Sequence, residues 1–458
     1  MKIIVLNGSP KGDISVTMQY VHFIQKKFPQ HELKIINISQ KITRIEKDEK
    51  VFQEIIDEVK ASDGVLWAFP LYFLLVHSHY KRFIELISEK KAEYAFKNKY
   101  TSVLTTSIHF FDHTAHNYIN AICDDLDMRY AGSFSANMYD LIKEKERERL
   151  ILFAEDFFEV IENKISTPKS YKPLTYSKFE YIPGNVEDKI DISDKKVTII
   201  TDSEDRQTNL GRMIERFRNS FSSEVEVINL NNLDIKGGCQ GCCQCGLDNI
   251  CIYQDQDEYI QFYNTKLKTA DVLIYAGTIK DRYLSSMWKM FFDRSFFNGH
   301  SPSLIGKQMG FIISGPLSQT PNLRQILEAY TGFQHANLVD FITDEYKDST
   351  QIDALLQSFA KRLIRFADKN YIKPSTFLVV GGMKVFRDDI WGRLRFVFQA
   401  DNRFYKKHGM YDFPQRDFKT RIRNTVMMLL TKIPVFKKEF IKRIKTEMIK
   451  PHQKIFED

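Results

Sequence analysis

Short apolar runs alternate with amphipathic stretches along the first part of the chain. Runs of this length, rich in β-branched residues, predict strands that are buried on both faces of a parallel sheet. We expect such strands at residues 2–6, 32–38, 64–69, 100–106 and 130–134. Helical spacing predicts helices at residues 51–60, 79–90, 115–126 and 143–161. Strands that alternate with helices favour an α/β fold with a doubly wound parallel sheet and right-handed crossovers.

The same pattern returns in the second half of the chain. Residues 196–203 (KVTIITDS) match residues 2–9 (KIIVLNGS). Residues 271–289 match 63–81, and residues 307–315 match 99–107, both at an offset of 208 residues. A pattern that recurs at a fixed offset indicates two copies of one structural unit.

Composition shifts divide the chain into four parts. Residues 1–165 form the first unit and residues 195–371 the second. Residues 166–194 contain three prolines and no periodicity, which is typical of a linker. Residues 372–458 follow the second unit as a basic, mostly helical extension.

Charge is concentrated at the end of the chain. Residues 361–458 contain 24 Lys and Arg against 10 Asp and Glu, whereas the whole chain carries a net charge of +7. In residues 420–450 these cations are mixed with apolar residues at near-helical spacing, which fits an anionic membrane surface or an acidic partner. The simpler interpretation is that the apolar face packs on the second unit. We expect no nucleic-acid binding, because no recognition motif accompanies the charge.

The start of the chain and its cysteines predict a cytoplasmic protein. The N-terminus enters a strand directly, without a charged leader, an apolar core or a cleavage site. No apolar run approaches the roughly 20 residues that span a bilayer. Six cysteines, four of them at metal-like spacing, fit a reducing compartment better than a disulfide scaffold.

Residues 7–17 (NGSPKGDISVT) lie between the first predicted strand and a helix. Loop amides and a helix N-terminus make an anion site, to which Ser9, Ser15 and Thr17 add hydroxyl groups. The loop matches neither the dinucleotide-binding nor the Walker pattern, and an ordinary strand-to-helix turn is the alternative. Ligands of parallel sheets bind at the carboxyl ends of the strands, where this loop should meet residues 70–73 and 107–112.

A cysteine cluster distinguishes the second unit from the first. The candidate metal ligands are Cys239, Cys242, Cys245 and Cys251. Their spacing suits a 4Fe–4S cluster and also tetrahedral zinc, and free or redox-active thiols are a third interpretation. Cys243 is a spare or alternative ligand, and Cys123 is predicted to be buried in a helix. The segment that contains His109, His113 and His116 matches no strong metal signature.

Three segments of the first unit resemble the flavodoxin-like NAD(P)H-dependent FMN reductases: residues 8–17, residues 69–72 followed by Lys81, and residues 106–112. The resemblance covers about residues 1–160 and implies that these segments bind FMN. The residues that it implies as FMN contacts are Ser9, Lys11, Ser15, Thr17, Pro70, Leu71, Tyr72, Phe73, Thr106, Ser107, His109 and Asp112.

The second unit resembles iron–sulfur flavoproteins of the same superfamily. The resemblance rests on the four cysteines, on Asp255 and Asp271, and on Lys289, Asp293 and Arg294. Its first loop, residues 201–206 (TDSEDR), departs from the pattern because it has three acids where a phosphate would dock. FMN binding by this unit therefore stays open. The residues that would contact such a second FMN are Ser203, Thr208 and Asn209.

The resemblance implies two flavodoxin-like sheets in tandem, each with strand order 2-1-3-4-5. It implies an oxidoreductase that takes hydride from NAD(P)H onto FMN. Electrons then pass to a small-molecule or protein acceptor, by way of an iron–sulfur cluster if one is present. No acid–base or nucleophilic residue is required for hydride transfer, so we assign none. An electron carrier reduced by a ferredoxin-like partner and a cofactor-poor scaffold anchored by its basic tail are the alternatives. Homo-oligomers are typical of such families.

Overall fold

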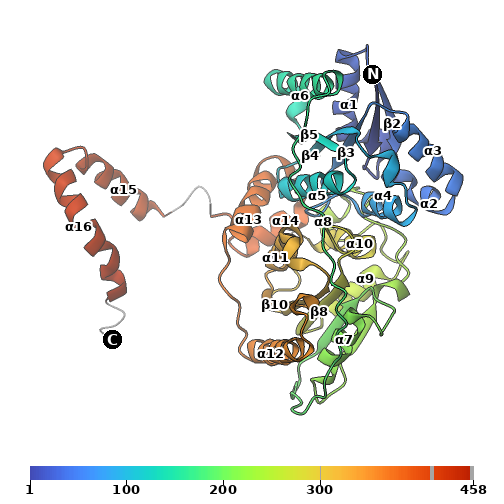
Figure 1. The fold of residues 1–458 in the computed structure, drawn as a ribbon. Coiled ribbons are helices and arrows are strands. Elements are labelled where there is room, and N and C mark those ends of the chain that lie inside the picture. The colour runs from blue at the N-terminus through green and yellow to red at the C-terminus, as the bar shows by residue number, and fades with distance from the viewer. Residues whose placement is uncertain (300, 413–416, 454–458) are drawn as a thin grey trace. The chain divides into compact units, whose positions relative to one another are not determined.

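The computed structural model describes residues 1–299, 301–412 and 417–453, so residues 413–416 and 454–458 of the predicted extension lie outside the described residues. The chain divides into two compact parts, Met1–Phe404 and Tyr405–Asp458. The larger part contains two five-stranded sheets in which all paired strands are parallel (Figure 1). The predicted α/β class with two doubly wound sheets is confirmed.

The first sheet has the order β2-β1-β3-β4-β5, as predicted. Its strands are β1 (Lys2–Asn7), β2 (Glu32–Asn37), β3 (Gly64–Pro70), β4 (Tyr100–Ser107) and β5 (Arg129–Asn137). Its helices are α1 (Val16–Lys27), α2 (Ile38–Lys47), α3 (Glu49–Lys60), α4 (Ser78–Glu89), α5 (Asp112–Asp125) and α6 (Glu144–Glu162). The sequence interpretation did not include α2, whose apolar face is limited to three buried isoleucines.

The second sheet has the order β10-β9-β8-β6-β7, the same topology as the first. Its strands are β6 (Val197–Thr201), β7 (Glu226–Asn229), β8 (Val272–Thr278), β9 (Gln308–Ser314) and β10 (Asn337–Thr343). Its helices are α7 (Asn209–Asn219), α8 (Cys245–Asp248), α9 (Tyr259–Phe262), α10 (Ser286–Arg294), α11 (Pro321–Phe333) and α12 (Ser349–Asp368). The two copies of the unit thus have the same order of strands.

Three hydrophobic cores hold the sheets and helices together. One core lies between the first sheet and helices α1 and α6, and another lies between the second sheet and helices α7 and α12. The largest core is continuous from helices α4 and α5 of the first unit to helices α10 and α11 of the second. The two units are therefore joined through their inner helical layers rather than through the linker alone.

Equivalent residues of α4 and α10 meet at this junction. Ser78 and Ser286 begin the two helices, and Glu85 and Asp293 lie at matching positions, 208 residues apart. The Ser78 N–H donates to Asp293 Oδ2 at 2.7 Å, and the Ser286 N–H donates to Glu85 Oε1 at 2.7 Å. Each helix N-terminus is thus capped by the acid of the other unit. The chain builds an internal pseudo-twofold interface, which an isologous dimer would need two chains to make.

Two buried lysines complete the interface. Lys81 and Lys289, again 208 residues apart, each pair with the acid four residues further along the same helix. Lys81 Nζ also reaches Asp281 of the second unit at 2.8 Å, and Lys289 Nζ donates to the carbonyl of Tyr72 in the first unit at 3.0 Å. Both lysine side chains are fully buried, so the charges are compensated entirely by these contacts.

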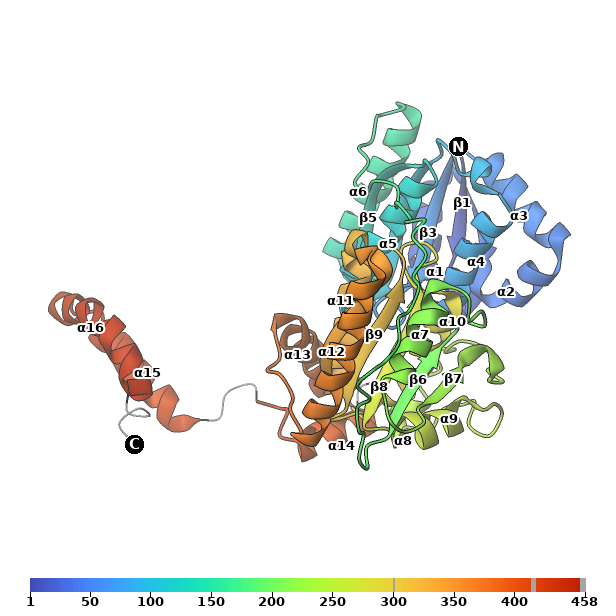
Figure 2. The same cartoon turned by 60° about the horizontal axis from the view of Figure 1, so that its bottom comes forward.

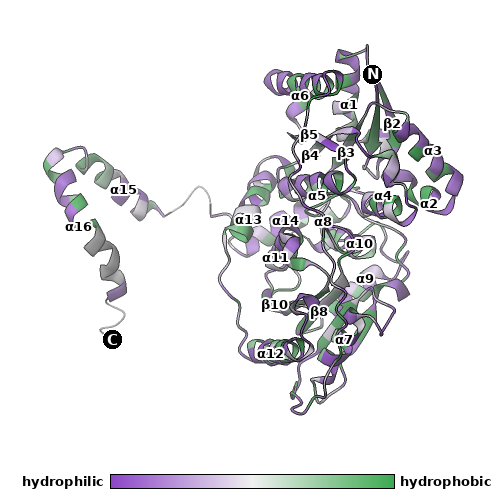
Figure 3. Ribbon diagram, in the orientation of Figure 1, coloured by the Kyte–Doolittle hydropathy of each residue, from purple (hydrophilic) through white to green (hydrophobic). Residues whose placement is uncertain are grey.

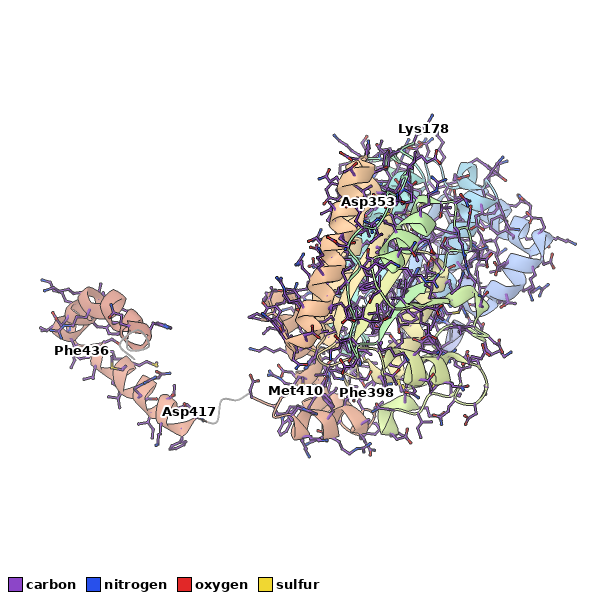
Figure 4. The ribbon with its side chains drawn as sticks, turned by 90° about the horizontal axis from the view of Figure 1, so that it is seen from below. Lys178, Asp353, Phe398, Met410, Asp417 and Phe436 are labelled. Atoms are coloured by element: carbon purple, nitrogen blue, oxygen red, sulfur yellow. The ribbon has the colours of Figure 1, made fainter. Side chains whose placement is uncertain are left out.

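The linker runs in extended form along the second unit (Figure 2). Tyr181 is fully buried in the core between the second sheet and helices α7 and α12. Its hydroxyl donates to Asp353, which Figure 4 labels. The Tyr181 N–H donates to Asn209 Oδ1 at 2.8 Å. The linker is therefore attached to the second unit, although its sequence has no periodicity.

The C-terminal extension is helical, as predicted, and begins with α13 (Phe377–Asp389), a π-helical turn (Ile390–Leu394) and α14 (Gln399–Lys407). Phe398, labelled in Figure 4, contacts Phe296 edge-on, with ring centroids 6.4 Å apart. Helices α15 (Phe418–Leu430) and α16 (Pro434–Gln453) belong to the smaller part of the chain. Among the described residues, no helix is long and apolar enough to cross a membrane.

Candidate functional site

The loops after β1, β3 and β4 meet at the carboxyl edge of the first sheet. Thr17 Oγ1 lies 2.6 Å from Thr106 Oγ1, which links the first loop to the end of β4. The Leu71 N–H donates to the carbonyl of Thr106 at 3.1 Å, which links the loop after β3 to the same residue. Pro70 and Ser107 are the last residues of β3 and β4, so they lie at this edge as well. The structure thus brings together segments that the sequence assigns to one site.

The first loop has the features of an anion cradle. Ser9 is fully buried, and its hydroxyl accepts the Lys11 N–H at 3.2 Å. Ser15 caps α1 by accepting the Met18 N–H at 3.3 Å. The start of a 12-residue helix carries partial positive charge, and Lys11 adds a full positive charge from an exposed position. Hydroxyl groups, amides and a cation therefore gather at one end of the sheet.

The loop after β4 contains a linked pair of charged groups. His109 Nδ1 lies 2.9 Å from Asp112 Oδ2, and the Ser135 hydroxyl donates to the same oxygen at 2.6 Å. Burial opposes ionisation of Asp112, but these hydrogen bonds hold its pKa well below the usual value. The hydrogen bond to Asp112 raises the pKa of His109. Burial lowers the pKa of His116 to about 4.

Four residues of these loops have strained backbone. Phe73, Leu74, His109 and Phe111 have φ values of 36°, 65°, 63° and 60°, in the left-handed region. Bulky residues rarely adopt this conformation, which costs of order 1–3 kcal/mol each and is typical of functional sites. The sequence carries no signal for this strain, because none of the four is a glycine or an asparagine.

The loop after β3 faces the second unit. The Phe73 ring stacks on Phe292, with centroids 6.3 Å apart and an interplanar angle of 11°, and lies 5.6 Å from Tyr330. The Tyr72 ring contacts His77 edge-on at 4.8 Å. Phe73 thus packs in the interface between the units, whereas Tyr72 lies where the cysteine-containing segment of the second unit approaches.

We call residues 237–253 the cysteine loop; it is held against the start of α4 by two histidines. His77 Nδ1 accepts the His79 N–H at 3.1 Å, so its Nε2 carries the proton and donates to the Cys239 carbonyl at 2.8 Å. The Gly238 N–H donates to His79 Nε2 at 3.2 Å. Burial lowers the pKa of both histidines, which keeps them neutral in these roles. Two histidines one residue apart before a helix are the sequence signal for this clamp.

Gly241 brings the cysteine loop into contact with the flavin loops of the first unit. Its φ is +63°, and a β-carbon at this position would lie 2.1 Å from Tyr72 Oη and 3.3 Å from Lys11 Cε. Only glycine fits this conformation and this spacing. The cysteine loop therefore touches both the anion cradle and the loop after β3.

The cysteine side chains of this loop surround one small cavity. It is lined by Cys239, Cys242, Cys243, Cys245 and Cys251, together with Gln240, Ile252, Tyr253, Arg294, Phe296 and Phe297. All four cysteines predicted as metal ligands thus face the same space. Its volume is about 20 Å³, room for roughly one water molecule. The Arg294 guanidinium, which is fully buried and paired with Asp257, places a positive charge in the wall.

Two of the thiols of the cavity are poor nucleophiles on their own. Burial raises the pKa of Cys239 to about 12 and also raises the pKa of Cys245. Thiols of this kind stay protonated unless a metal lowers their pKa. All six cysteines are unpaired, and Cys123 is buried, as predicted. Within the described ranges, no three His, Cys, Asp or Glu side chains are arranged to hold a single metal ion.

Comparison with protein families identifies the first unit. Residues 1–138 match the family described as NADPH-dependent FMN reductase. The matched part covers less than half of the chain. It includes the anion cradle and the loops after β3 and β4, and it supports an NAD(P)H-dependent FMN oxidoreductase. We refer to residues 1–165 as the FMN reductase unit.

Solved structures similar to the chain include three flavoenzymes. An NADH:FMN oxidoreductase, EMOB, in its apo form, is 17% identical over 34% of this chain and 87% of its own, with a TM-score of 0.30. FerB, an NAD(P)H:acceptor oxidoreductase from Paracoccus denitrificans, is 17% identical over 35% of this chain and 97% of its own (TM-score 0.28). An FMN-dependent NADH-azoreductase from Bacillus anthracis is 15% identical over 36% and 97% (TM-score 0.26). No curated protein matches the chain.

The corresponding loop of the second unit does not fit a phosphate. Asn209 Nδ2 donates to the carbonyl of Phe179 in the linker at 2.9 Å and to Asp344 at 3.0 Å. Thr208 caps α7, and its hydroxyl donates to the Asp205 carbonyl at 2.8 Å. The Ser203 hydroxyl lies 3.5 Å from the same carbonyl, so the hydroxyl groups and the amide are already engaged. The three acids of this loop would also repel an anion.

Proposed function

We propose that the chain passes electrons from NAD(P)H, by way of FMN on the FMN reductase unit, into the cysteine loop of the second unit. The observation that supports this path is the contact of Gly241 with Tyr72 and Lys11. A donor and an acceptor that share a surface within one chain need no mobile carrier between them. The internal interface between α4 and α10 holds the donor and the acceptor in a fixed position relative to each other.

FMN supplies the step between two-electron and one-electron chemistry, because it accepts hydride and releases electrons singly. Ser9, Ser15 and Thr17 would hold its phosphate at the start of α1, with Lys11 supplying positive charge. In the loop after β4, His109 is paired with the Asp112 carboxylate. The positive charge of Lys11 favours an anionic cofactor at this edge of the sheet.

The cysteine loop supplies ligands for a 4Fe–4S cluster. Cys239, Cys242, Cys245 and Cys251 face one cavity, and soft thiolates are the ligands that such a cluster requires. Each thiolate binds a different iron atom, so the four sulfur atoms need not converge on one point, as they must around zinc. The cavity is small, so the four side chains have to move apart to admit the cluster. The buried Arg294 offsets part of the negative charge of the thiolates.

Electrons would leave such a cluster at the outer side of the cysteine loop. Cys242 is exposed there, whereas the other cysteines of the loop are partly covered. Transfer at an exposed ligand suits an acceptor that takes one electron at a time, either a small molecule or a ferredoxin-like protein.

Replacing Cys251 by alanine tests the assignment of the cluster. The variant is expected to lose nearly all iron and acid-labile sulfide, because one of four ligands is missing, while it keeps FMN and its reduction by NADPH. Iron, sulfide and flavin assays on protein purified without oxygen measure these quantities. Cys243→Ala is the matched control, because Cys243 lines the same cavity outside the ligand set and its loss should leave the iron content unchanged. Equal iron in wild type and in the double variant Cys243→Ala, Cys251→Ala would refute the assignment, because Cys243 lines the same cavity and could replace a single missing ligand.

A further inference from the structure

Among the side chains that the structure describes, helices α15 and α16 bury no hydrophobic residue. No residue of α15 is buried within its part of the chain. Phe418 and Leu429 of α15 are 70% and 58% exposed, and Val435 of α16 is 80% exposed. A 13-residue helix without packing is marginally stable in water. These helices therefore need a further surface on which their apolar side chains can be buried.

The apolar residues of α15 lie on one face. Phe418, Ile422, Val426 and Leu429 are spaced by four, four and three residues, which places them along one stripe of the helix. Figure 3 shows hydrophobic and hydrophilic residues interleaved along α15 and α16. An apolar stripe of this kind can be buried by contact with a flat apolar surface.

The same helices are strongly basic. Residues 418–443 contain eight Lys and Arg and one acid, Glu439. Lys419 and Arg423 lie beside the apolar stripe of α15, where their long side chains can extend to either side of it. An apolar stripe bordered by cations matches the interface of an anionic bilayer, in which acyl chains lie beneath negatively charged headgroups.

We infer that α15 and α16 attach the protein to the surface of anionic membranes. The helices lie along the interface, because no helix among the described residues is suited to cross the bilayer. An acidic protein would match the charge equally well, but it would not offer the continuous apolar layer that the stripe of α15 requires. The basic character of the tail thus complements a lipid surface.

Flotation of the full-length protein with vesicles tests this inference. We expect binding to vesicles of phosphatidylcholine with phosphatidylserine, little binding to phosphatidylcholine alone, and release from the anionic vesicles by high salt. Leu429→Ser is expected to reduce binding several-fold, because it removes an exposed apolar contact without disturbing a core. Leu152→Ser is the matched control, because Leu152 is 63% exposed on α6 of the FMN reductase unit.

Three results would overturn the inference. The first is the absence of binding to anionic vesicles. The second is equal loss of binding in Leu429→Ser and Leu152→Ser. The third is retention on an acidic polypeptide such as polyglutamate without retention on vesicles, which would identify an acidic protein as the partner. None of these readouts depends on flavin or iron.

Discussion

Replacing Lys289 by alanine is expected to lower the free energy of unfolding by about 3–5 kcal/mol. The Lys289 side chain is fully buried and pairs with Asp293, whose carboxylate also accepts the Ser78 N–H across the interface between the units. Without the lysine, this carboxyl group is left buried and uncompensated. Denaturant unfolding followed by circular dichroism measures the loss.

Lys280→Ala is the matched control for this variant. Lys280 lies 3.5 Å from Glu89 across the same interface, but both side chains are more than one-third exposed. Exposed pairs contribute about 0–1 kcal/mol, so the control should unfold almost like the wild type. Similar losses in the two variants would contradict the importance of the buried pair.

The stability of Lys289→Ala is also expected to fall as the pH rises. Burial raises the pKa of Asp293 above its ordinary value even in the wild type, where Lys289 opposes the rise, so removal of the lysine raises it further. A carboxyl group whose pKa is higher in the folded chain binds its proton more tightly when folded. Stability therefore declines as the pH rises above about 3.9, the unfolded value, and levels off above the raised pKa. A larger deficit relative to wild type at about pH 8 than at about pH 5 would show this linkage.

Replacing Gly241 by alanine is expected to slow electron transfer from the flavin into the cysteine loop. The new β-carbon would lie 2.1 Å from Tyr72 Oη, so the loop has to move away from the FMN reductase unit. A wider gap between the flavin and the cysteine loop is expected to lower the rate of electron transfer several-fold. Single-turnover reduction with NADPH measures the step, and the rate of flavin reduction itself should stay close to that of the wild type.

Gly306→Ala is the control that separates the displacement of the cysteine loop from the effect of backbone strain. Gly306 also has a positive φ, +79°, but a β-carbon there would have no neighbour within 4 Å. Both variants carry the cost of an alanine in the left-handed region, and only Gly241→Ala pushes against Tyr72. Equal transfer rates in the two variants would show that the contact with Tyr72 does not position the loop.

The two sheets are predictable from the sequence because local pattern determines them. Buried strands such as β3 and β8 are short apolar runs, and the recurrence of the pattern 208 residues later reveals the duplication. Helix α2 is harder to predict, because its three buried isoleucines stand among polar residues and its N-cap Asn37 makes no capping hydrogen bond. For the five strands of the first sheet, the predicted boundaries differ from the observed ones mainly at the carboxyl ends.

The arrangement of the site cannot be predicted from the sequence in the same way. The spacing of the cysteines identifies a ligand set, but the contact of Gly241 with Tyr72 depends on how the two units pack. That packing is determined by reciprocal pairs such as Ser78 with Asp293, which are distant in the sequence and follow no periodicity. Tyr181 is a similar case, because a single side chain buried from an irregular linker produces no pattern.

Anaerobic stopped-flow mixing with NADPH tests the central claim most directly, with flavin and iron–sulfur absorbance followed separately. If electrons pass within the chain, flavin reduction comes first and the change in iron–sulfur absorbance follows at a rate independent of protein concentration. Iron–sulfur absorbance that stays unchanged, or that changes at a rate proportional to protein concentration, would contradict the account.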